Sequence, residues 1–289
     1  MTDLRTAACV MLTEDAGLSP RQFAQLALSV ETPEDLWTTP PETLGASVGL
    51  TAGQITKLTR AQKRQDKIVA RIDALVAGGL DIMTCFDASY YPRLLKLTDP
   101  PPRLYRKGCE DTVSRYLFVT GTIDDDAHLI GLAAEAGKTL ATLGLGLVST
   151  LHPGIEVGAH IGALSKEGSH LVFLPGGHHL IAPPEHVSLC EQICATGILV
   201  SDHAPTVAPT ERARTESSRL AVAQSHGVIL IGWDPDSPYA QRILNQAELE
   251  GTPVFYLADN RQSGQDLLRS AGAYPVADVQ ALDLILQYL

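Results

Sequence analysis

The sequence predicts an α/β protein in which a doubly wound, mostly parallel sheet follows a small all-helical domain. From residue 116 onward, short apolar runs alternate about six times with segments of helical spacing. This alternation is typical of parallel strands joined by crossover helices. Residues 1–80 instead show helical spacing throughout, and the chain is long enough for about two domains. The predicted strands are Tyr116–Thr120, Leu145–Ser149, Leu171–Leu174, Ile198–Ser201, Val228–Gly232 and Pro253–Leu257.

The predicted helical domain covers residues 1–80 and is divided into short pieces by prolines. Ser19-Pro20 begins one helix, and a longer helix is expected from Thr51 to Ala77, ending at Gly78-Gly79. Basic side chains spaced three or four residues apart share one face of this helix. They could form a solvated surface, which is the common case, contact phosphates, with Arg60, Arg64 and Lys67 as the candidates, or dock on an acidic protein partner. The full stripe is Lys57, Arg60, Arg64, Lys67 and Arg71.

The remaining chain divides into a predicted connector over residues 81–115, an α/β core over 116–260 and a C-terminal extension over 261–289. The connector contains Tyr91-Pro92 and the run Asp99–Pro102, which cannot lie inside a helix. In doubly wound sheets, ligands bind beyond the carboxyl ends of the strands. The loops expected to line a site are therefore Gly121-Thr122, Thr150–Gly154, Pro175–Gly177, Asp202–Pro205 and Trp233–Ser237.

The composition limits the classes of function. No apolar run reaches the ~20 residues of a membrane span, no secretory signal is visible, and five scattered cysteines are typical of reduced thiols, so a cytoplasmic location is expected. The net charge is −11, and residues 116–258 carry 6 basic against 15 acidic side chains. Phosphate binding needs clustered positive charge, so this balance disfavours nucleic-acid binding by the core as a whole.

Four segments in a fixed order carry a resemblance to a known family. Val148–Leu164, VSTLHPGIEVGAHIGAL, is similar to a strand–loop–helix signature V-S-G-x-A-x-G-I-D-x-x-A-H-x-x-A-L. Gly79–Gly108 contains a Tyr-Pro, an Asp-Pro-Pro and an aliphatic–aromatic pair before a glycine. Gly197–Pro205 is similar to G-x-L-x-S-E-x-P, and Ser263–Ala273 to G-x-N-x-L-I-x-x-G-A. Together these segments resemble the DNA-processing protein A family (DprA, also called Smf).

This resemblance implies an extended Rossmann-like core preceded by a helical domain of the SAM or helix-hairpin-helix type. Members of the family bind single-stranded DNA, help to load RecA during natural transformation and form homodimers through their α/β domains. The resemblance therefore implies a binding protein and not an enzyme, with no cofactor, metal or catalytic residue. Together with the strand-end loops, it gives these candidate ligand- or DNA-binding residues: Gly121, Thr122, Ser149, Gly154, His160, Gly176, Gly177, Ser201, Arg212, Arg214, Arg219 and Ser237.

The chain departs from the family pattern in its phosphate-contacting loops. The family's G-S-R reads Gly121-Thr122-Ile123 and is followed by Asp124, Asp125 and Asp126, carboxylates that compete with a phosphate for a helix N-terminus. One arginine of the family's F-P-x-R-N-R run survives as Arg219, and the later S-G-S becomes Ser237-Pro238-Tyr239. Arg212 and Arg219, seven residues apart, are expected to share a helical face toward the strand-end cleft. The sequence thus predicts a divergent member with weakened phosphate loops.

Several residues allow both a functional and a structural interpretation. His160 could contact a ligand or act as a base, but a buried imidazole bonded to backbone is the favoured interpretation. Gly176-Gly177 is expected to form a tight turn with positive φ, because the phosphoribohydrolase motif that begins with Pro-Gly-Gly does not continue here. The spacing pairs neither Ser149 nor Ser201 with a histidine. The pairs His178-His179 and Cys190/Cys194 lack the further ligands of a metal site.

Three hypotheses of function follow. The first is a DprA-like single-stranded DNA-binding protein of DNA processing and recombination. The second is a DprA-like regulatory partner that restrains a neighbour-encoded phosphoribosyltransferase-like toxin in a phage-defence module, a role that the acidic core also fits. The third is a nucleoside-monophosphate phosphoribohydrolase, which the missing motif residues disfavour.

Overall fold

The computed structural model describes residues 2–32, 34–109, 113–121, 126–234, 236–258 and 265–289. The chain divides into two compact units, the first comprising residues 1–107 with 202–204 and the second residues 108–201 with 205–289. No helix in the described part of the chain combines the length and the apolar character needed to cross a membrane.

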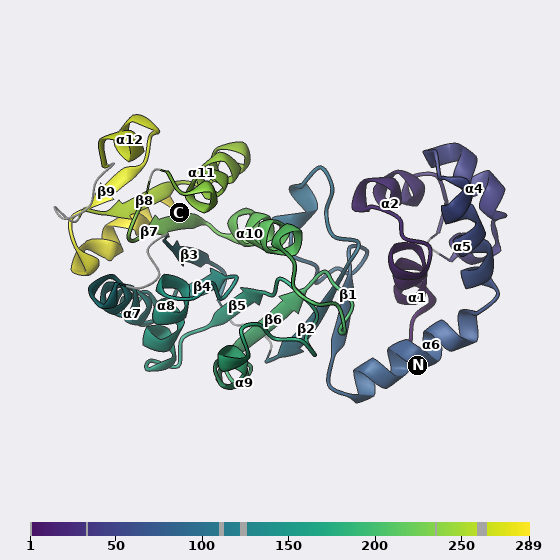
Figure 1. Cartoon of the computed structure of the whole chain (residues 1–289), viewed down its shortest axis with the longest axis horizontal. Coiled ribbons are helices and arrows are strands. Elements are labelled where there is room, and N and C mark those ends of the chain that lie inside the picture. Colours follow the sequence, from purple (N-terminus) through teal and green to yellow (C-terminus); the bar gives the residue numbers. More distant parts are fainter. Residues whose placement is uncertain (1, 33, 110–112, 122–125, 235, 259–264) are drawn as a thin grey trace. The chain divides into compact units, whose positions relative to one another are not determined.

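The first unit contains short helices, a longer helix α6 and an antiparallel pair of strands (Figure 1). Capping boxes at Ser19/Gln22 and Thr51/Gln54 fix the starts of α2 and α5. Its apolar core is formed by the inner faces of these helices together with strand residues such as Ile82 and Tyr105. The elements are α1 (Leu4–Val10), the π-helical turn η1 (Met11–Asp15), α2 (Pro20–Ala27), α3 (Asp35–Thr38), α4 (Pro41–Val48), α5 (Ala52–Gln62), α6 (Gln65–Ala77), β1 (Asp81–Thr84), η2 (Leu94–Lys96) and β2 (Arg103–Gly108).

The single long helix predicted from Thr51 to Ala77 is wrong, because the chain forms two helices, α5 and α6, that are separated at Lys63 and Arg64. Arg64 leaves the helical conformation with φ −119° and ψ 22°. The side-chain amide of Gln62 donates to the carbonyl oxygens of Leu36 and Thr39, both at 2.9 Å. Since no glycine or proline lies at this break, these tertiary hydrogen bonds account for the end of α5 better than any local signal.

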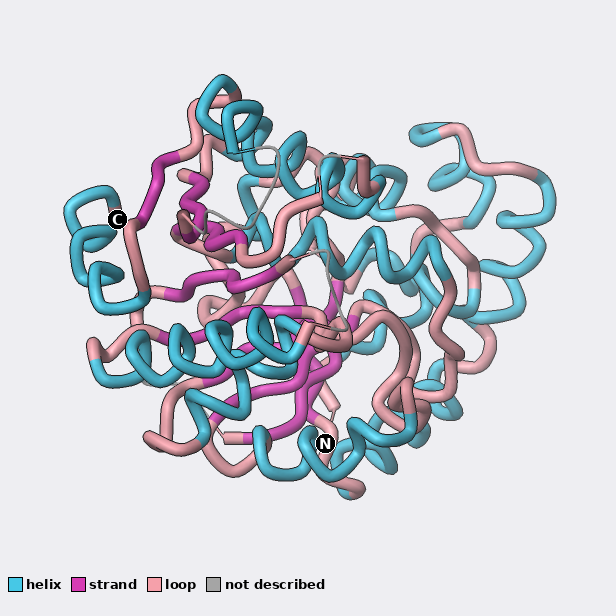
Figure 2. The backbone as a smooth tube through the Cα atoms, turned by 60° about the vertical axis from the view of Figure 1, so that its left-hand side comes forward, coloured by secondary structure: helices cyan, strands magenta, loops and turns pink. Residues whose placement is uncertain are grey.

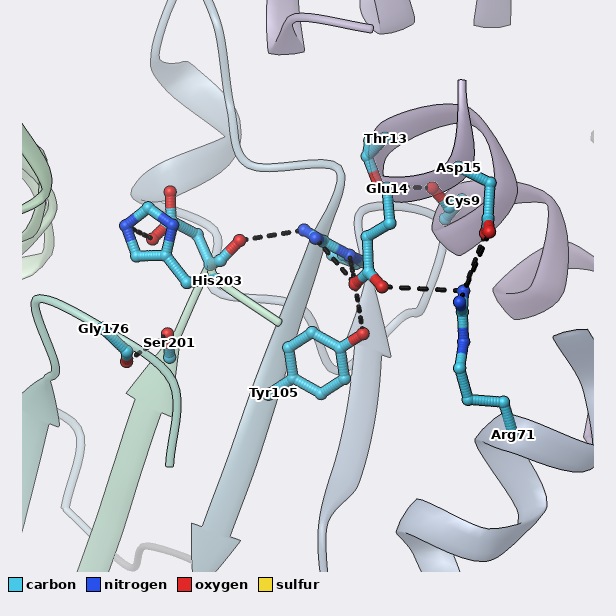
Figure 3. A network of polar contacts seen from close by, with 11 residues as sticks. Cys9, Thr13, Glu14, Asp15, Arg71, Tyr105, Gly176, Ser201 and His203 are labelled. Carbon is cyan, nitrogen blue, oxygen red and sulfur yellow. Dashed lines mark hydrogen bonds and ion pairs between the residues drawn. The ribbon is translucent and has the colours of Figure 1, made fainter. Parts of the chain in front are cut away.

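A part-buried polar network ties η1 to β2 and to α6 in the first unit (Figure 3). Arg103 is 6% exposed, and its guanidinium donates to Glu14 at 2.8 Å and to the carbonyl oxygen of Asp202 at 2.9 Å. The hydroxyl of Tyr105 donates to the same carboxylate, and Arg71 pairs with Asp15 at 2.7 Å. Burial raises the pKa of Tyr105 well above its usual value, with Glu14 as a further cause. A charge buried this deeply is stable only when paired, as it is here.

The second unit is a doubly wound sheet with helices on both faces (Figures 1 and 2). Its described strands are all parallel, in the order β6-β5-β4-β3-β7-β8-β9. α7 and α8 pack with η4 on one face, while α10 and α11 lie on the other. The elements are β3 (Tyr116–Thr120), α7 (Ala127–Thr142), β4 (Gly146–Ser149), α8 (Ile155–Leu164), β5 (His170–Phe173), η3 (Pro184–His186), α9 (Val187–Ile193), β6 (Gly197–Ser201), α10 (Glu211–Gln224), β7 (Gly227–Leu230), α11 (Pro238–Glu250), β8 (Val254–Leu257), α12 (Gln265–Ser270), β9 (Tyr274–Val276) and η4 (Val279–Tyr288).

The predicted fold class is confirmed, because the seven parallel strands in the described part of the second unit follow a helical region. The six predicted strands correspond to β3 to β8 within about one or two residues. The chain steps outward from β3 to β6 and then crosses to β7 on the other side of β3. This reversal places the switch in strand order beside β3, where doubly wound sheets bind their ligands.

Helices α7 and α8 touch backbone to backbone. A Cβ atom at Gly137 would overlap the carbonyl oxygen of Ala159, and one at Gly162 would overlap that of Ala134. Only glycine permits this approach, which brings α8 and its N-terminal loop close against the sheet.

Candidate functional site: a polar pocket at the carboxyl ends of the strands

A pocket of about 610 Å³ lies in the second unit beyond the carboxyl ends of β4 and β5. Two arginines and several hydroxyl groups contribute to its lining, so it is polar. Its size falls within the range of small-molecule sites. The loop after β4, the loop after β5, and the N-terminal parts of α10 and α11 supply its walls. The lining residues are Thr150, His152, Pro153, Pro175, Ala182, Pro183, Glu211, Arg214, Ser217, Ser218, Tyr239 and Arg242.

A buried carboxylate, Glu156 in the first turn of α8, holds these walls together. Its Oε2 accepts from the backbone N–H of Thr150 at 2.8 Å, from the Thr150 hydroxyl at 3.0 Å and from the N–H of His152 at 3.0 Å. Its Oε1 accepts from the hydroxyls of Thr120 at 2.8 Å and Tyr239 at 2.7 Å. With only 1% of its surface exposed, Glu156 therefore connects β3, the loop after β4 and α11.

Tyr239 is the ring at the centre of this arrangement. It stacks on His152 with ring centroids 5.1 Å apart, and the Arg242 guanidinium lies 6.0 Å from its centroid. Burial and the negative charge of Glu156 raise the pKa of Tyr239 well above its usual value, so its hydroxyl stays a hydrogen-bond donor at neutral pH. The pocket thus joins an aromatic stack to guanidinium groups.

The arginines of the pocket agree only in part with those predicted. Arg214 lines the pocket and pairs only loosely with the exposed Glu211, at 3.4 Å. Arg242, which the sequence analysis did not select, lines it as well and has no ion-pair partner among the described residues. The prediction that Arg212 and Arg219 face the cleft is wrong, because neither contributes to the lining and Arg219 is bound to Glu216 at 2.5 Å.

His160 lies in the core and not in the pocket. It is fully buried, with its Nε2 2.6 Å from the Ser149 hydroxyl and its Nδ1 2.7 Å from Nδ1 of His170. The structural interpretation was right about burial but wrong about the partners, which are side chains and not backbone. The sequence spacing, which paired Ser149 with no histidine, did not reveal this contact. Burial lowers the pKa of His160, and it lowers the pKa of His170 to about 4, so both rings are neutral at pH 7. Ser149 is 2% exposed, so this pair has no access to a substrate.

The predicted glycines act mainly through close backbone approach. Gly176 does not have the positive φ that was expected. A glycine is needed there for a different reason, because a Cβ atom would lie 2.9 Å from Pro209. Its carbonyl accepts from the Ser201 hydroxyl at 2.9 Å, and Gly177 N–H donates to Val207. Gly154 does have a positive φ, +81°, at the start of α8. A side chain at Gly121 would overlap the carbonyl oxygen of Ile231.

The N-terminus of α7 is capped from within the chain. Oδ1 of Asp126 accepts from the N–H of His128 at 2.8 Å and of Leu129 at 3.2 Å. Thr122, with Ile123, Asp124 and Asp125, lies outside the described residues. Ser237 precedes α11 without capping it through its side chain, and it does not line the pocket.

The N-terminal candidates lie in the first unit. Arg60 lies on α5, Arg64 at the break and Lys67 on α6, and all three are exposed. Arg71 of the predicted stripe differs from them because it is engaged by Asp15. Among the described residues, no group of histidine, cysteine and carboxylate side chains has the arrangement of a metal site.

Sequence reasoning missed four residues that define the pocket: His152, Glu156, Tyr239 and Arg242. Glu156 occupies the acidic position of the signature in Val148–Leu164, so the motif itself could have identified it. Arg242 follows Tyr239 by three residues on a helix, a spacing that places both on one face. His152 lies in the loop Thr150–Gly154, which was expected to line a site, but nothing singled it out within that loop.

The comparisons with known proteins agree with this architecture. Residues 81–286 match the model of the family described as DNA recombination-mediator protein A. Protein Smf of Synechocystis sp. is 28% identical over 228 residues, which cover 76% of this chain and 56% of the relative. Protein Smf of Escherichia coli is 29% identical over 151 residues, covering 50% of this chain and 40% of that protein. The chain thus spans about half the length of these curated relatives.

Two solved structures share the fold. DNA processing protein A of Streptococcus pneumoniae superposes with a TM-score of 0.79 at 18% identity, covering 97% of both chains. DNA processing protein A of Helicobacter pylori, studied for its single-stranded DNA binding mode, gives 0.62 at 22% identity, covering 73% of this chain and 97% of that one. The family model covers more than half of the sequence, and it confirms the family that the motifs predicted. The chain belongs to the DNA recombination-mediator protein A family.

Proposed function

We propose that this chain binds single-stranded DNA in DNA processing and that the pocket beyond β4 and β5 contacts the strand. The observation that carries this proposal is the joint presence of Arg214 and Arg242 beside the Tyr239 stack in one pocket. Cationic groups that track phosphates, combined with aromatic rings near the bases, are the usual chemistry of single-strand binding. The Helicobacter pylori protein of the same fold supports the choice of ligand.

The two arginines are available to a phosphate. Glu211, the partner of Arg214, is 90% exposed at its side chain, and a surface pair of this kind contributes about 0–1 kcal/mol. A phosphate can therefore replace that carboxylate at little cost. These guanidiniums take over the role of the arginine that the first loop lacks, although they reach the pocket from α10 and α11.

The pocket favours binding over chemistry. Ser149 and His160 form the clearest hydroxyl–imidazole pair, yet both are buried in the core. The hydroxyls of Ser217 and Ser218 donate to the carbonyl oxygen of Arg214 within their own helix. Neither arrangement gives an accessible nucleophile with a base. Homodimer formation and a RecA partner stay predictions from the family resemblance.

A fluorescence-anisotropy titration tests the proposal with a labelled ~30-nucleotide single strand at about 50 and about 200 mM salt. The double variant Arg214→Ala/Arg242→Ala should lose about tenfold or more in affinity and lower the salt slope by about 1. The variant Lys138→Ala/Lys166→Ala is the matched control, because it removes two exposed charges of the same unit outside the pocket. Equal loss in both variants, or no binding by the wild type even at low salt, would refute the assignment.

A further inference from the structure

Five exposed cations are concentrated in the first unit on α5, on α6 and at the break between them. They occupy eleven consecutive positions that contain a single acidic residue, Asp66. None of the five has an ion-pair partner among the described residues. We call this set the α5–α6 basic face; it consists of Lys57, Arg60, Lys63, Arg64 and Lys67.

Other arginines of the first unit do have ion-pair partners. Arg5 lies 3.3 Å from Asp3 and 3.4 Å from Glu34, Arg71 lies 2.7 Å from Asp15, and Arg106 is bonded to Asp81. Residues 1–115 carry 14 basic and 14 acidic side chains, so acidic groups are available in number. The chain thus pairs Arg5, Arg71 and Arg106 with carboxylates and leaves the five cations of this face without such a pair among the described residues.

The face is held on a fixed scaffold. Leu58 and Ala61 of α5, and Ile68 and Ile72 of α6, are buried in the core, so the cations between them project toward solvent. The amide of Gln62 fixes the junction of the two helices through its two hydrogen bonds. At a helical rise of 1.5 Å per residue, the backbone positions of the five cations span on the order of 15 Å. Like charges held this closely repel one another, and a polyanion relieves that repulsion.

We propose that the α5–α6 basic face is a second contact for the phosphate backbone of a nucleic-acid strand, independent of base sequence. The inference rests on the proposed function, since it assigns to the same strand a contact beyond the pocket. Several phosphates fit within the span of the face, whereas no aromatic side chain belongs to it, so it would add affinity and no base preference. Its occupant is a strand long enough to leave the pocket.

The prediction is a dependence on strand length. Labelled oligothymidylates of ~6 and ~30 nucleotides are titrated against the full chain at about 50 and about 200 mM salt. The variant Arg60→Ala/Arg64→Ala/Lys67→Ala should lose about tenfold or more in affinity for the long strand and lower its salt slope by about 2, at about 0.7 per lost phosphate contact. Its affinity for the short strand should stay within about twofold of wild type.

A charge-matched control and a competitor make the test decisive. Arg21→Ala/Lys96→Ala/Lys107→Ala removes three exposed cations of the same unit outside the face and should leave both affinities within about twofold. Equal losses in the control would show that only net charge matters. Displacement of the long strand by polyglutamate as readily as by unlabelled DNA would favour an acidic protein partner. Either result would overturn the proposal, as would an unchanged affinity of the face variant for the long strand.

The pocket variant separates this inference from the proposed function. Loss of both strands in Arg214→Ala/Arg242→Ala, with an unchanged long-strand affinity in the face variant, would leave the proposed function intact and remove the second contact. Long-strand loss in the face variant alone would support the second contact and refute the pocket. Because the substituted side chains of the face are exposed, their replacement by alanine, a strong helix former, should leave the thermal unfolding midpoint unchanged.

Discussion

Replacement of Glu156 is the sharpest test of how the pocket is built. Glu156→Ala removes the acceptor of five hydrogen bonds that join three elements of the second unit. The hydroxyls of Thr120 and Tyr239 lie 3.3 Å apart and can rotate to bond each other. The backbone N–H groups of Thr150 and His152 cannot rotate in this way, so the substitution leaves them without an acceptor.

The magnitude follows from those two N–H groups. A buried donor left without a partner costs about 1–3 kcal/mol, and water entering from the polar pocket offsets part of this cost. We therefore expect Glu156→Ala to lower the free energy of unfolding by about 3 kcal/mol. Glu156→Gln keeps an oxygen for the N–H groups and offers its amide to the two hydroxyl oxygens, so it should cost only about 1 kcal/mol.

Urea denaturation followed by tryptophan fluorescence measures both values. The chain has two tryptophans, Trp37 and Trp233. In a Trp37→Phe background the signal reports Trp233, which is buried in the second unit. Glu135→Ala, an exposed carboxylate on α7, is the control and should change stability by less than about 0.5 kcal/mol. The reasoning fails if Glu156→Ala costs less than about 1 kcal/mol, or if the Gln and Ala variants are equally unstable.

Three further outcomes are expected. The pKa of His170 is lowered to about 4 in the folded chain, against about 6.5 in the unfolded chain, so between these pH values the unfolded chain binds more protons. The free energy of unfolding should therefore fall as pH drops from about 6.5 toward 4. Urea midpoints that do not change with pH in that window would contradict this. Gly162→Ala should lower the free energy of unfolding, measured by urea denaturation, by about 2 kcal/mol or more, because the added methyl group forces α7 and α8 apart. Gly131→Ala, at a site with open space around it, should be neutral or stabilising by up to about 1 kcal/mol. Similar losses in the two variants would refute the backbone contact. Arg103→Gln should cost about 2–3 kcal/mol because it removes a charged hydrogen-bond partner of the half-buried Glu14 carboxylate, which keeps Arg71 at 3.6 Å and the Tyr105 hydroxyl. Arg106→Gln, at a more exposed pair, should cost less than about 1 kcal/mol, and thermal unfolding compares the two.

The parts of the fold that the sequence predicts are those in which burial dominates. Strands β3 to β7 are buried along their whole length, so their sequences are short continuous apolar runs that can be recognised directly. β9 was missed because it has three residues, of which Tyr274 and Pro275 are exposed. The break between α5 and α6 depends on Gln62 reaching carbonyl groups more than twenty residues away, which no local pattern records.

The candidate site also has a part that the sequence predicts and a part that depends on tertiary contacts. Motif spacing pointed to the loop after β4 and its helix, and Arg214, one of the residues predicted from the motifs, lines the pocket. It could not pair Ser149 with His160 or His160 with His170, because those contacts depend on the register of β4 against β5 and on the depth of α8. Arg219 shows the reverse error: its side chain matches a family position, yet a neighbouring glutamate one turn away engages it.

The Asp126 cap also bears on ion selectivity. A carboxylate attached to the helix that it caps acts at an effective concentration in the millimolar range or above, because it cannot diffuse away. Free phosphate or another small anion must compete with this tethered ligand for the N–H groups of His128 and Leu129. The cap therefore disfavours the binding of dilute inorganic anions at these two N–H groups. A ligand that other parts of the protein hold at the same time competes with the side chain on better terms.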